Sequence, residues 1–329
     1  MDFPEILTTR VLTATAENFK FPTFVLQNMV PVDPIDGDLA EWDITEPNVK
    51  VDTDFVVRDG EAQPTDYNVI KHQTANLFHT FKWKKIDPEH LENLRGVGTR
   101  ERRSREHITR EQVDMVRRHG ALLDEYLLWR MLSGSITVTI GGVSTTVDYG
   151  LPNSHKPTAA VSWFTAGTDI LSDIRDWKNT LTEDSSRIPQ MAFFNSSLTP
   201  AFINNTVIQN YLSNSAEGAR VVSEGMVSRL MGLRLIEWDG VYKTSAGTTT
   251  KFVPDDRFII LPELTIDWIK MIRGTVAIPA DDGQSYSMAR DGFYVDVSKN
   301  PVALLMYYKA CRLPVMTVPK CEMYCDVTP

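Results

Sequence analysis

The sequence has little cysteine, no long apolar run and no excess of basic charge. Its three cysteines are an odd count in 329 residues, which fits free thiols in a reducing compartment and argues against a disulfide framework. The longest apolar stretch, 258–269, is interrupted by Pro262, Glu263 and Asp267, so it falls short of the roughly 18 residues of a membrane helix. A net charge of −9 is unlike that of a dedicated nucleic-acid-binding protein.

The N-terminal segment Met1–Glu5 is acidic and lacks the basic and then apolar layout of a signal peptide. Hydrophobic residues make up 42 % of the chain and charged residues 23 %, which is close to an average soluble globular protein. This composition excludes collagen, a coiled-coil rod and bulk disorder. The length suggests about two domains.

The motifs that usually indicate catalysis are missing too. The chain has no Gly-x-Ser-x-Gly elbow and no Gly-x4-Gly-Lys phosphate loop. No histidine follows His155, so a zinc site using Cys321 and Cys325 is poorly supplied, and two thiols on the inward face of a strand are favoured. The acidic turn at 33–38 does not have the spacing of a calcium loop. We therefore expect no catalytic residue, no metal site and no cofactor.

The first 98 residues have patterning but little core of their own. Five prolines punctuate residues 1–47, which indicates an extended arm with a short helix near 5–18. Apolar and polar residues alternate over 49–57 and over 77–84, which predicts two strands of a long projecting ribbon. Because a lone two-stranded ribbon is marginally stable in water, we expect another subunit to cover it.

A long helix and a hairpin are predicted next. Apolar residues recur at helical spacing over 99–132, and Ser133-Gly134 ends the helix. Alternation over 135–149 around Gly141-Gly142 predicts a β-hairpin. Between Arg95 and Arg118 stand eight arginines against four acids, and this basic stretch either contacts phosphates or pairs with acidic neighbours.

Residues 150–290 are typical of a compact α/β region. A helix capped by Thr168 or Asp169 is predicted through Leu181, and Thr199-Pro200 is predicted to cap and begin a helix that runs to Leu212. The remaining predicted elements are a helix near 216–231 and strands at 191–194, 233–238, 257–261, 293–297 and 321–327.

Several stretches, spread over most of the chain, follow one another in an order that resembles a known family of proteins. They are 49–85, the run Arg-Glu-Arg-Arg-Ser-Arg at 100–105, 108–132, 136–140, 233–240, 252–262 and 314–327. In this order they resemble the major capsid proteins of tailed bacteriophages, which have the Hong Kong 97-like fold. More narrowly, they resemble the lambda-type major capsid protein E family, in which a Trp-Asp-Gly turn like that at 238–240 precedes a Pro-Asp strand like that at 254–261.

The resemblance implies an α+β fold with four parts. These are an N-terminal arm (1–45), an extended loop (46–86), a peripheral domain with a long spine helix (87–149 and 291–329) and an α/β apical domain (150–290). The strand at 314–327 would close the peripheral domain. The implied function is structural: hexamers and pentamers of the chain would assemble into an icosahedral shell that encloses phage double-stranded DNA.

The resemblance also implies partners and a location. The chain opens directly on the arm, so we expect a separate scaffolding protein rather than a fused one. A portal and a possible decoration protein are the other implied partners, with at most weak, non-specific contact to packaged DNA and no membrane. The expected location is the virion, after assembly in the cytoplasm of the bacterial host.

Six residues are candidates for contacts between subunits. Phe55, Phe81 and Trp83 stand on the predicted ribbon, which lacks a core of its own. The basic residues Arg102, Arg103 and Arg105 would pair with acidic neighbours or contact DNA.

Two alternatives remain open at this point. An encapsulin-type compartment shell protein shares the fold that the resemblance implies. A soluble α/β enzyme, such as a hydrolase or a transferase, would need a site that the sequence does not reveal.

Overall fold

The computed structural model describes the following residues: 24–45, 69–86, 107, 111, 114–115, 120–140, 142–213, 227–244, 246–280, 285–299 and 302–329. The predicted helix near 5–18, the strand 49–57 and most of the predicted helix 216–231 lie outside them. The chain divides into two compact units. Unit 1 takes its described residues from Met1–Glu41, Thr74–Leu128 and Lys270–Val315, and unit 2 takes them from Trp42–Gln73, Trp129–Ile269 and Met316–Pro329.

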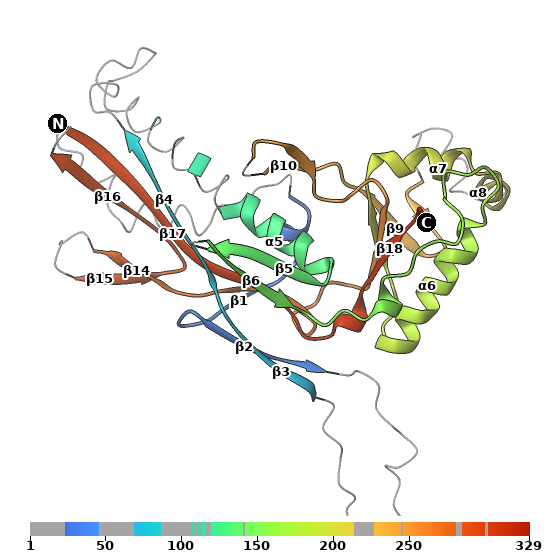
Figure 1. Ribbon diagram of the computed structural model, residues 1–329, viewed down its shortest axis with the longest axis horizontal. Coiled ribbons are helices and arrows are strands. Elements are labelled where there is room, and N and C mark those ends of the chain that lie inside the picture. Colours follow the sequence, from blue (N-terminus) through green and yellow to red (C-terminus); the bar gives the residue numbers. More distant parts are fainter. Residues whose placement is uncertain are drawn as a thin grey trace, which may run out of the picture. The chain divides into compact units, whose positions relative to one another are not determined.

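Unit 1 is built around a five-stranded sheet in which a long central strand, β17, pairs with β4 and β16 along its length. Both pairings are antiparallel, and Figure 1 shows the three strands running side by side. A short strand, β1, joins β13 in parallel. The strands are β1 (Val32–Pro34), β4 (Phe78–Ile86), β13 (Ile269–Arg273), β16 (Asp291–Lys299) and β17 (Val302–Met316).

The strand predicted at 77–84 is confirmed as β4, but its described partner is β17 and not a second ribbon strand. A two-stranded ribbon does occur, between β2 (Leu39–Thr45) and β3 (Val69–Asn76). The predicted extended arm, 1–45, thus contains a paired strand at 39–45 that the sequence did not predict. Ala40, Trp42 and Ile44 are buried in alternation with exposed neighbours, and this period of two dictates a strand.

The C-terminal part of the predicted long helix is confirmed as α5 (Leu122–Leu132). It ends where expected, because the chain turns at Ser133–Gly134 and Gly134 takes a φ of +96° that suits glycine. The predicted hairpin is confirmed as β5 (Ser135–Ile140) and β6 (Val143–Asp148). Among the described residues, no helix is long and apolar enough to cross a membrane.

Unit 2 contains a second five-stranded sheet, in the order β18-β12-β7-β9-β8. Figure 1 shows α6, α7 and α8 gathered beside it. Five aromatic rings fill the core between them, with the centroids of contacting pairs 5.1–6.5 Å apart: Trp163, Trp177, Phe194, Phe202 and Phe258. The strands are β7 (Met191–Phe194), β8 (Arg229–Leu230), β9 (Leu233–Glu237), β12 (Arg257–Leu261) and β18 (Met323–Asp326).

The helices of unit 2 agree only in part with those predicted from the sequence. Asp169 caps α6 (Ile170–Ser185) by accepting the N–H of Ser172, as predicted. The single helix predicted after Thr199-Pro200 is wrong, since the chain forms α7 (Thr199–Asn204) and α8 (Thr206–Leu212) instead. Asn205 separates them, because its side chain accepts the N–H groups of Val207 and Ile208 and so starts a new helix.

Two further expectations are corrected. The helix predicted near 216–231 does not include Arg229–Leu230, which form β8, and the turn at Met231–Gly232 has two positive φ values that a helix cannot hold. The strand expected to close the peripheral domain, 314–327, is divided. Its last part, β18, pairs with β12 of unit 2, because its apolar residues Met323 and Cys325 complete the core of that sheet.

The remaining described elements are short and lie outside the two five-stranded sheets. They are α2 (Leu26–Met29), β10 (Val241–Lys243), β11 (Thr249–Lys251), β14 (Val276–Pro279), β15 (Tyr286–Ala289) and the 3-10 turns η2 (Asn153–His155), η3 (Ser196–Leu198) and η4 (Pro319–Cys321).

Candidate intersubunit surface

One face of the unit 1 sheet carries a row of aromatic rings across three strands. Tyr307 of β17 is the register partner of both Trp83 of β4 and Tyr294 of β16, so these side chains share one face. Tyr307 stacks on Tyr294 with ring centroids 4.7 Å apart and on Phe81 at 5.7 Å. Together with Lys309, these four residues form what we call the aromatic face.

The aromatic face is open to solvent. Phe81 is 53 % exposed and Trp83 is 61 % exposed, while Tyr294 and Tyr307 are half-buried. The ammonium of Lys309 lies 5.0 Å from the ring centroid of Phe81 and 5.7 Å from that of Tyr294, which favours both rings by cation–π attraction. A contiguous exposed aromatic surface of this kind usually indicates a binding partner.

The opposite face of the sheet is buried along β16 and β17, while Lys82 of β4 is exposed on it. Phe293 and Tyr308 are fully buried and pack ring to ring at 4.8 Å. Lys84 points to this side and forms an ion pair with Glu111, which lies in a helical turn. The sheet therefore has one face that belongs to the core of unit 1 and one that presents large apolar side chains outward.

A buried ionic cluster fixes the strands that carry the aromatic face. Arg312 of β17 donates to Asp124 of α5 at 2.6 Å and to Asp291 of β16 at 2.7 Å. Arg273 of β13 donates to the same two carboxylates at 2.9 and 3.3 Å. Two cations thus neutralise two anions, and the cluster joins one helix to three strands.

The neighbouring carboxylates outweigh burial in setting the charge state of Arg312. Burial alone would lower the pKa of Arg312, but the carboxylates of Asp124 and Asp291 hold that pKa well above its usual value, so the guanidinium stays charged. Burial raises the pKa of Tyr308 well above its usual value. The neutral Tyr308 hydroxyl donates to Asp291 at 2.8 Å and accepts from Arg312 at 2.6 Å.

A second buried carboxylate holds the first described segment of the chain. Glu125 of α5 is fully buried and accepts the backbone N–H groups of Val25, Leu26 and Gln27 at 3.3, 3.2 and 2.7 Å. These are the first N–H groups of α2, which have no partner inside so short a helix. Leu26 is fully buried beside them, so residues 24–30 are held on α5 by one side chain.

Replacing Glu125 by alanine is expected to release this segment, because three backbone donors lose one charged acceptor. Such hydrogen bonds contribute about 1.5–3 kcal/mol each at most, and limited proteolysis followed by mass spectrometry should find new cleavage within residues 24–30. Glu125→Gln should give an intermediate result, since the amide keeps one acceptor oxygen. The exposed Glu41 provides the control. Equal protection of the segment in Glu125→Ala and Glu41→Ala would contradict this role.

The sequence-predicted contact residues divide into two groups. Phe81 and Trp83 stand on the same face of β4, as their spacing predicts, while Phe55, Arg102, Arg103 and Arg105 lie outside the described residues. Tyr294, Tyr307 and Lys309 were missed. The predicted strand at 293–297 contained Tyr294, but β16 and β17 lie beside each other and β17 beside β4 only in the fold.

The two thiols predicted on one face of a strand are separated, because Cys321 lies in the turn before the strand and only Cys325 lies on β18. Cys321 of η4 and Cys325 of β18 are both free and fully buried. Across the described part of the chain, no group of three or more histidine, cysteine or acidic side chains could hold a metal ion.

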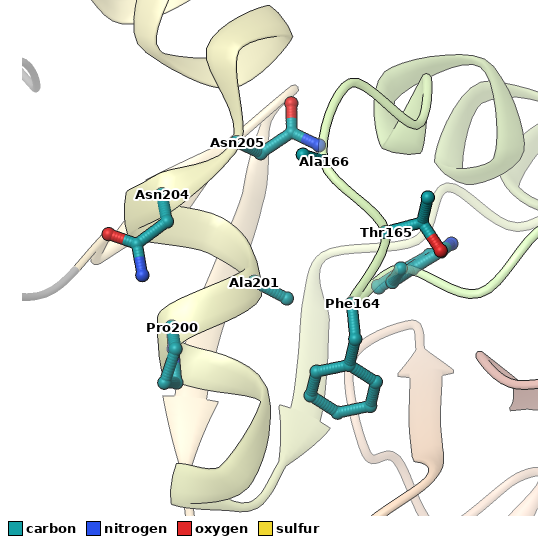
Figure 2. Close-up of a pocket in the computed structure, with 8 residues that line it drawn as sticks. Phe164, Thr165, Ala166, Pro200, Ala201, Asn204 and Asn205 are labelled. Carbon is teal, nitrogen blue, oxygen red and sulfur yellow. The ribbon is translucent and has the colours of Figure 1, made fainter.

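Two small hollows of unit 2 adjoin α7. Figure 2 shows one of about 150 Å³, with Phe164 and Pro200 on opposite sides and Ala201 between them. The other, of about 420 Å³, is lined by the carboxylate of Glu237, which accepts the Thr199 hydroxyl at 2.6 Å. The residues lining these hollows include no set of metal ligands.

Solved structures with the same fold include phage capsid proteins. A putative capsid protein of a prophage from Escherichia coli CFT073 aligns with a TM-score of 0.61 and 14 % identity, covering 97 % of this chain and 99 % of the other. A phage-related protein from Bordetella bronchiseptica aligns at 0.59 and 9 % identity, covering 98 % and 97 %. The chain therefore has the Hong Kong 97-like fold predicted above.

The fold by itself does not separate a phage capsid from an encapsulin. The holo encapsulin complex of Synechococcus elongatus aligns at a TM-score of 0.50 with 9 % identity, covering 94 % of this chain and 90 % of the other. None of the curated proteins compared with this sequence matches it significantly.

A match to a family model depends on the sequence itself and not on the fold alone. The model for phage major capsid protein E matches residues 8–296, which is most of the chain and includes β4, α5 and strands β7, β9 and β12 of unit 2. This match agrees with the open aromatic face, because a shell subunit must present contact surfaces to its copies. The chain belongs to the phage major capsid protein E family and is a structural, shell-forming protein of the virion.

Proposed function

We propose that copies of this chain assemble as hexamers and pentamers into an icosahedral shell around phage double-stranded DNA, and that the aromatic face is one of their contacts. The observation that carries this proposal is the exposure of Phe81 and Trp83 on a sheet whose other face buries Phe293, Met306 and Tyr308. Aromatic side chains with this exposure are the usual core of protein interfaces.

We assign the proposed peripheral and apical domains to the two units. The unit 1 sheet, with α5 and the helical residues before it, corresponds to the proposed peripheral domain. The unit 2 sheet with α6, α7 and α8 corresponds to the proposed apical domain, to which β18 also belongs by its pairing with β12. The proposed arm begins before the segment that Glu125 holds, and the proposed extended loop continues from the β2–β3 ribbon.

The remaining partners are proposed from the family alone. They are a separate scaffolding protein, a portal and a decoration protein, with assembly in the cytoplasm of the bacterial host. The net charge of −9 repels DNA, so packaged DNA would not adhere to the shell wall in general. Arg102, Arg103 and Arg105 are proposed as local exceptions that either pair with acidic neighbouring subunits or contact phosphates.

Electron microscopy of the purified chain, alone and after expression with the scaffolding protein of the same phage, tests the proposal. Closed particles or capsomer rings are the expected result, and sedimentation should show them as fast species. A monodisperse monomer under both conditions would contradict shell formation. Protein cargo in place of nuclease-protected DNA, in particles from infected cells, would favour the encapsulin alternative.

A further inference from the structure

A buried acid of unit 2 has no hydrogen-bond partner. Glu322, between η4 and β18, is fully buried, and neither of its carboxyl oxygens accepts or donates a hydrogen bond. An ionised carboxylate in such a place would cost several kcal/mol. The carboxyl is therefore neutral in this structure, where no group compensates a negative charge directly.

The histidine that contacts the backbone of Glu322 is already occupied. His155 is fully buried, and its Nδ1 lies 2.7 Å from the backbone carbonyl of Glu322. Because a carbonyl only accepts, this nitrogen carries a proton. The Nε2 atom lies 2.9 Å from a carboxylate oxygen of Asp184 on α6. Both ring nitrogens are used, so His155 has nothing left for the Glu322 side chain.

One cation lies close enough to favour ionisation. Lys156 is exposed, and its positive charge acts against burial, which otherwise raises the pKa of Glu322 well above its usual value. The Lys156 ammonium lies against the turn at Gly134, where a Cβ atom would come within 2.8 Å of it. The charges that act on the adjacent Cys321 include Arg187 and Asp267, which form an ion pair with each other, and Lys320 directly precedes it in the chain.

We propose that Glu322 is a buried acid switch that loosens residues 319–325 of unit 2 as the pH rises. When Glu322 loses its proton, the carboxylate leaves its apolar site and pairs with Lys156 near the surface. Because Glu322 follows η4 directly and precedes β18, this movement pulls on both elements. Cys321 and Cys325, which are fully buried on either side, become accessible as a result.

The direction of the pH effect follows from linkage. The unfolded chain holds the Glu322 proton less tightly than the folded chain, so folding is favoured by the proton. Glu322 makes its full contribution to the free energy of unfolding below the ordinary glutamate pKa. This contribution is lost as the pH rises toward the higher pKa of the folded state. The switch therefore works in the direction opposite to an ordinary salt-bridged carboxylate, which loses stability on acidification.

Glu322→Gln tests the proposal on the full chain, because glutamine has the same shape and stays neutral at every pH. The two proteins should melt alike at pH 4, and the variant should melt higher by about 4 °C or more at pH 8. Labelling of Cys321 and Cys325 by a maleimide should be about tenfold faster in the wild type than in the variant at pH 8. The ratio should fall to one at pH 5.

Lys156→Met provides a second test. This variant keeps Glu322 but lacks the nearby cation, so labelling of its cysteines should accelerate at a higher pH than in the wild type. Superimposable melting and labelling profiles of wild type and Glu322→Gln at all pH values would overturn the switch. A constant destabilisation of Glu322→Gln at every pH would also overturn it, since that result means that the carboxyl has a structural partner. These readouts are measured on the subunit, so they do not depend on shell formation.

Discussion

Replacing Arg312 by alanine is expected to prevent stable folding of unit 1. The guanidinium is 1 % exposed and bonds Asp124, Asp291 and the Tyr308 hydroxyl. Removing one partner of a buried ion pair leaves an uncompensated charge and costs about 3–5 kcal/mol. Since whole domains are stable by only about 5–15 kcal/mol, the variant should accumulate in the insoluble fraction or melt far below the wild type in calorimetry.

The neighbouring cation provides a matched control. Arg273 bonds the same two carboxylates, but its side chain is 19 % exposed and its bonds are longer, at 2.9 and 3.3 Å. Arg273→Ala removes the more exposed cation and leaves Arg312 bonded to both carboxylates, so its melting temperature should fall less. Equal losses in the two variants would contradict the ranking. A wild-type melting temperature for Arg312→Ala would contradict the role of the cluster altogether.

Replacing Trp83 by alanine is expected to block shell formation while leaving the subunit folded. Because the indole is 61 % exposed, its truncation removes little packing within the subunit, where surface substitutions change stability by about 0.5 kcal/mol or less. At an interface, a large aromatic side chain contributes about 2 kcal/mol or more, which is about 30-fold in affinity per contact. A shell repeats that loss at every equivalent contact.

Circular dichroism and sedimentation separate the two effects for Trp83→Ala: the spectrum should match the wild type and the fast-sedimenting species should disappear. Phe81→Ala should behave in the same way, because Phe81 is part of the same face. Tyr286 on β15 is 75 % exposed and lies outside the aromatic face, so Tyr286→Ala serves as the control and should still assemble. Normal particles from Trp83→Ala would refute the contact.

Local patterns in the sequence predicted most single elements. Alternation found β4 and the β5–β6 hairpin, and the Asp169 cap marked the start of α6. These features depend on neighbours within a few residues. The period of two over 39–45 was equally local and was missed only because the surrounding prolines indicated an arm.

Long-range choices could not be predicted in this way. Nothing within residues 77–84 shows that β4 pairs with β17, more than 200 residues later. The charges of Asp124, Asp291 and Arg312 are unremarkable in sequence, and they become a cluster only when three elements meet. The tail was assigned to the wrong sheet for the same reason, because the partner of β18 is chosen by core packing in unit 2. The family resemblance supplied the function, while the fold located the aromatic face.

A cryo-electron microscopy reconstruction of assembled particles, at a resolution that shows side chains, tests the central claim most directly. The account predicts a closed shell in which a neighbouring copy covers Phe81 and Trp83, which are 53 % and 61 % exposed in the single subunit. A shell in which both side chains face solvent in every copy would contradict the assignment of the aromatic face as a contact between subunits.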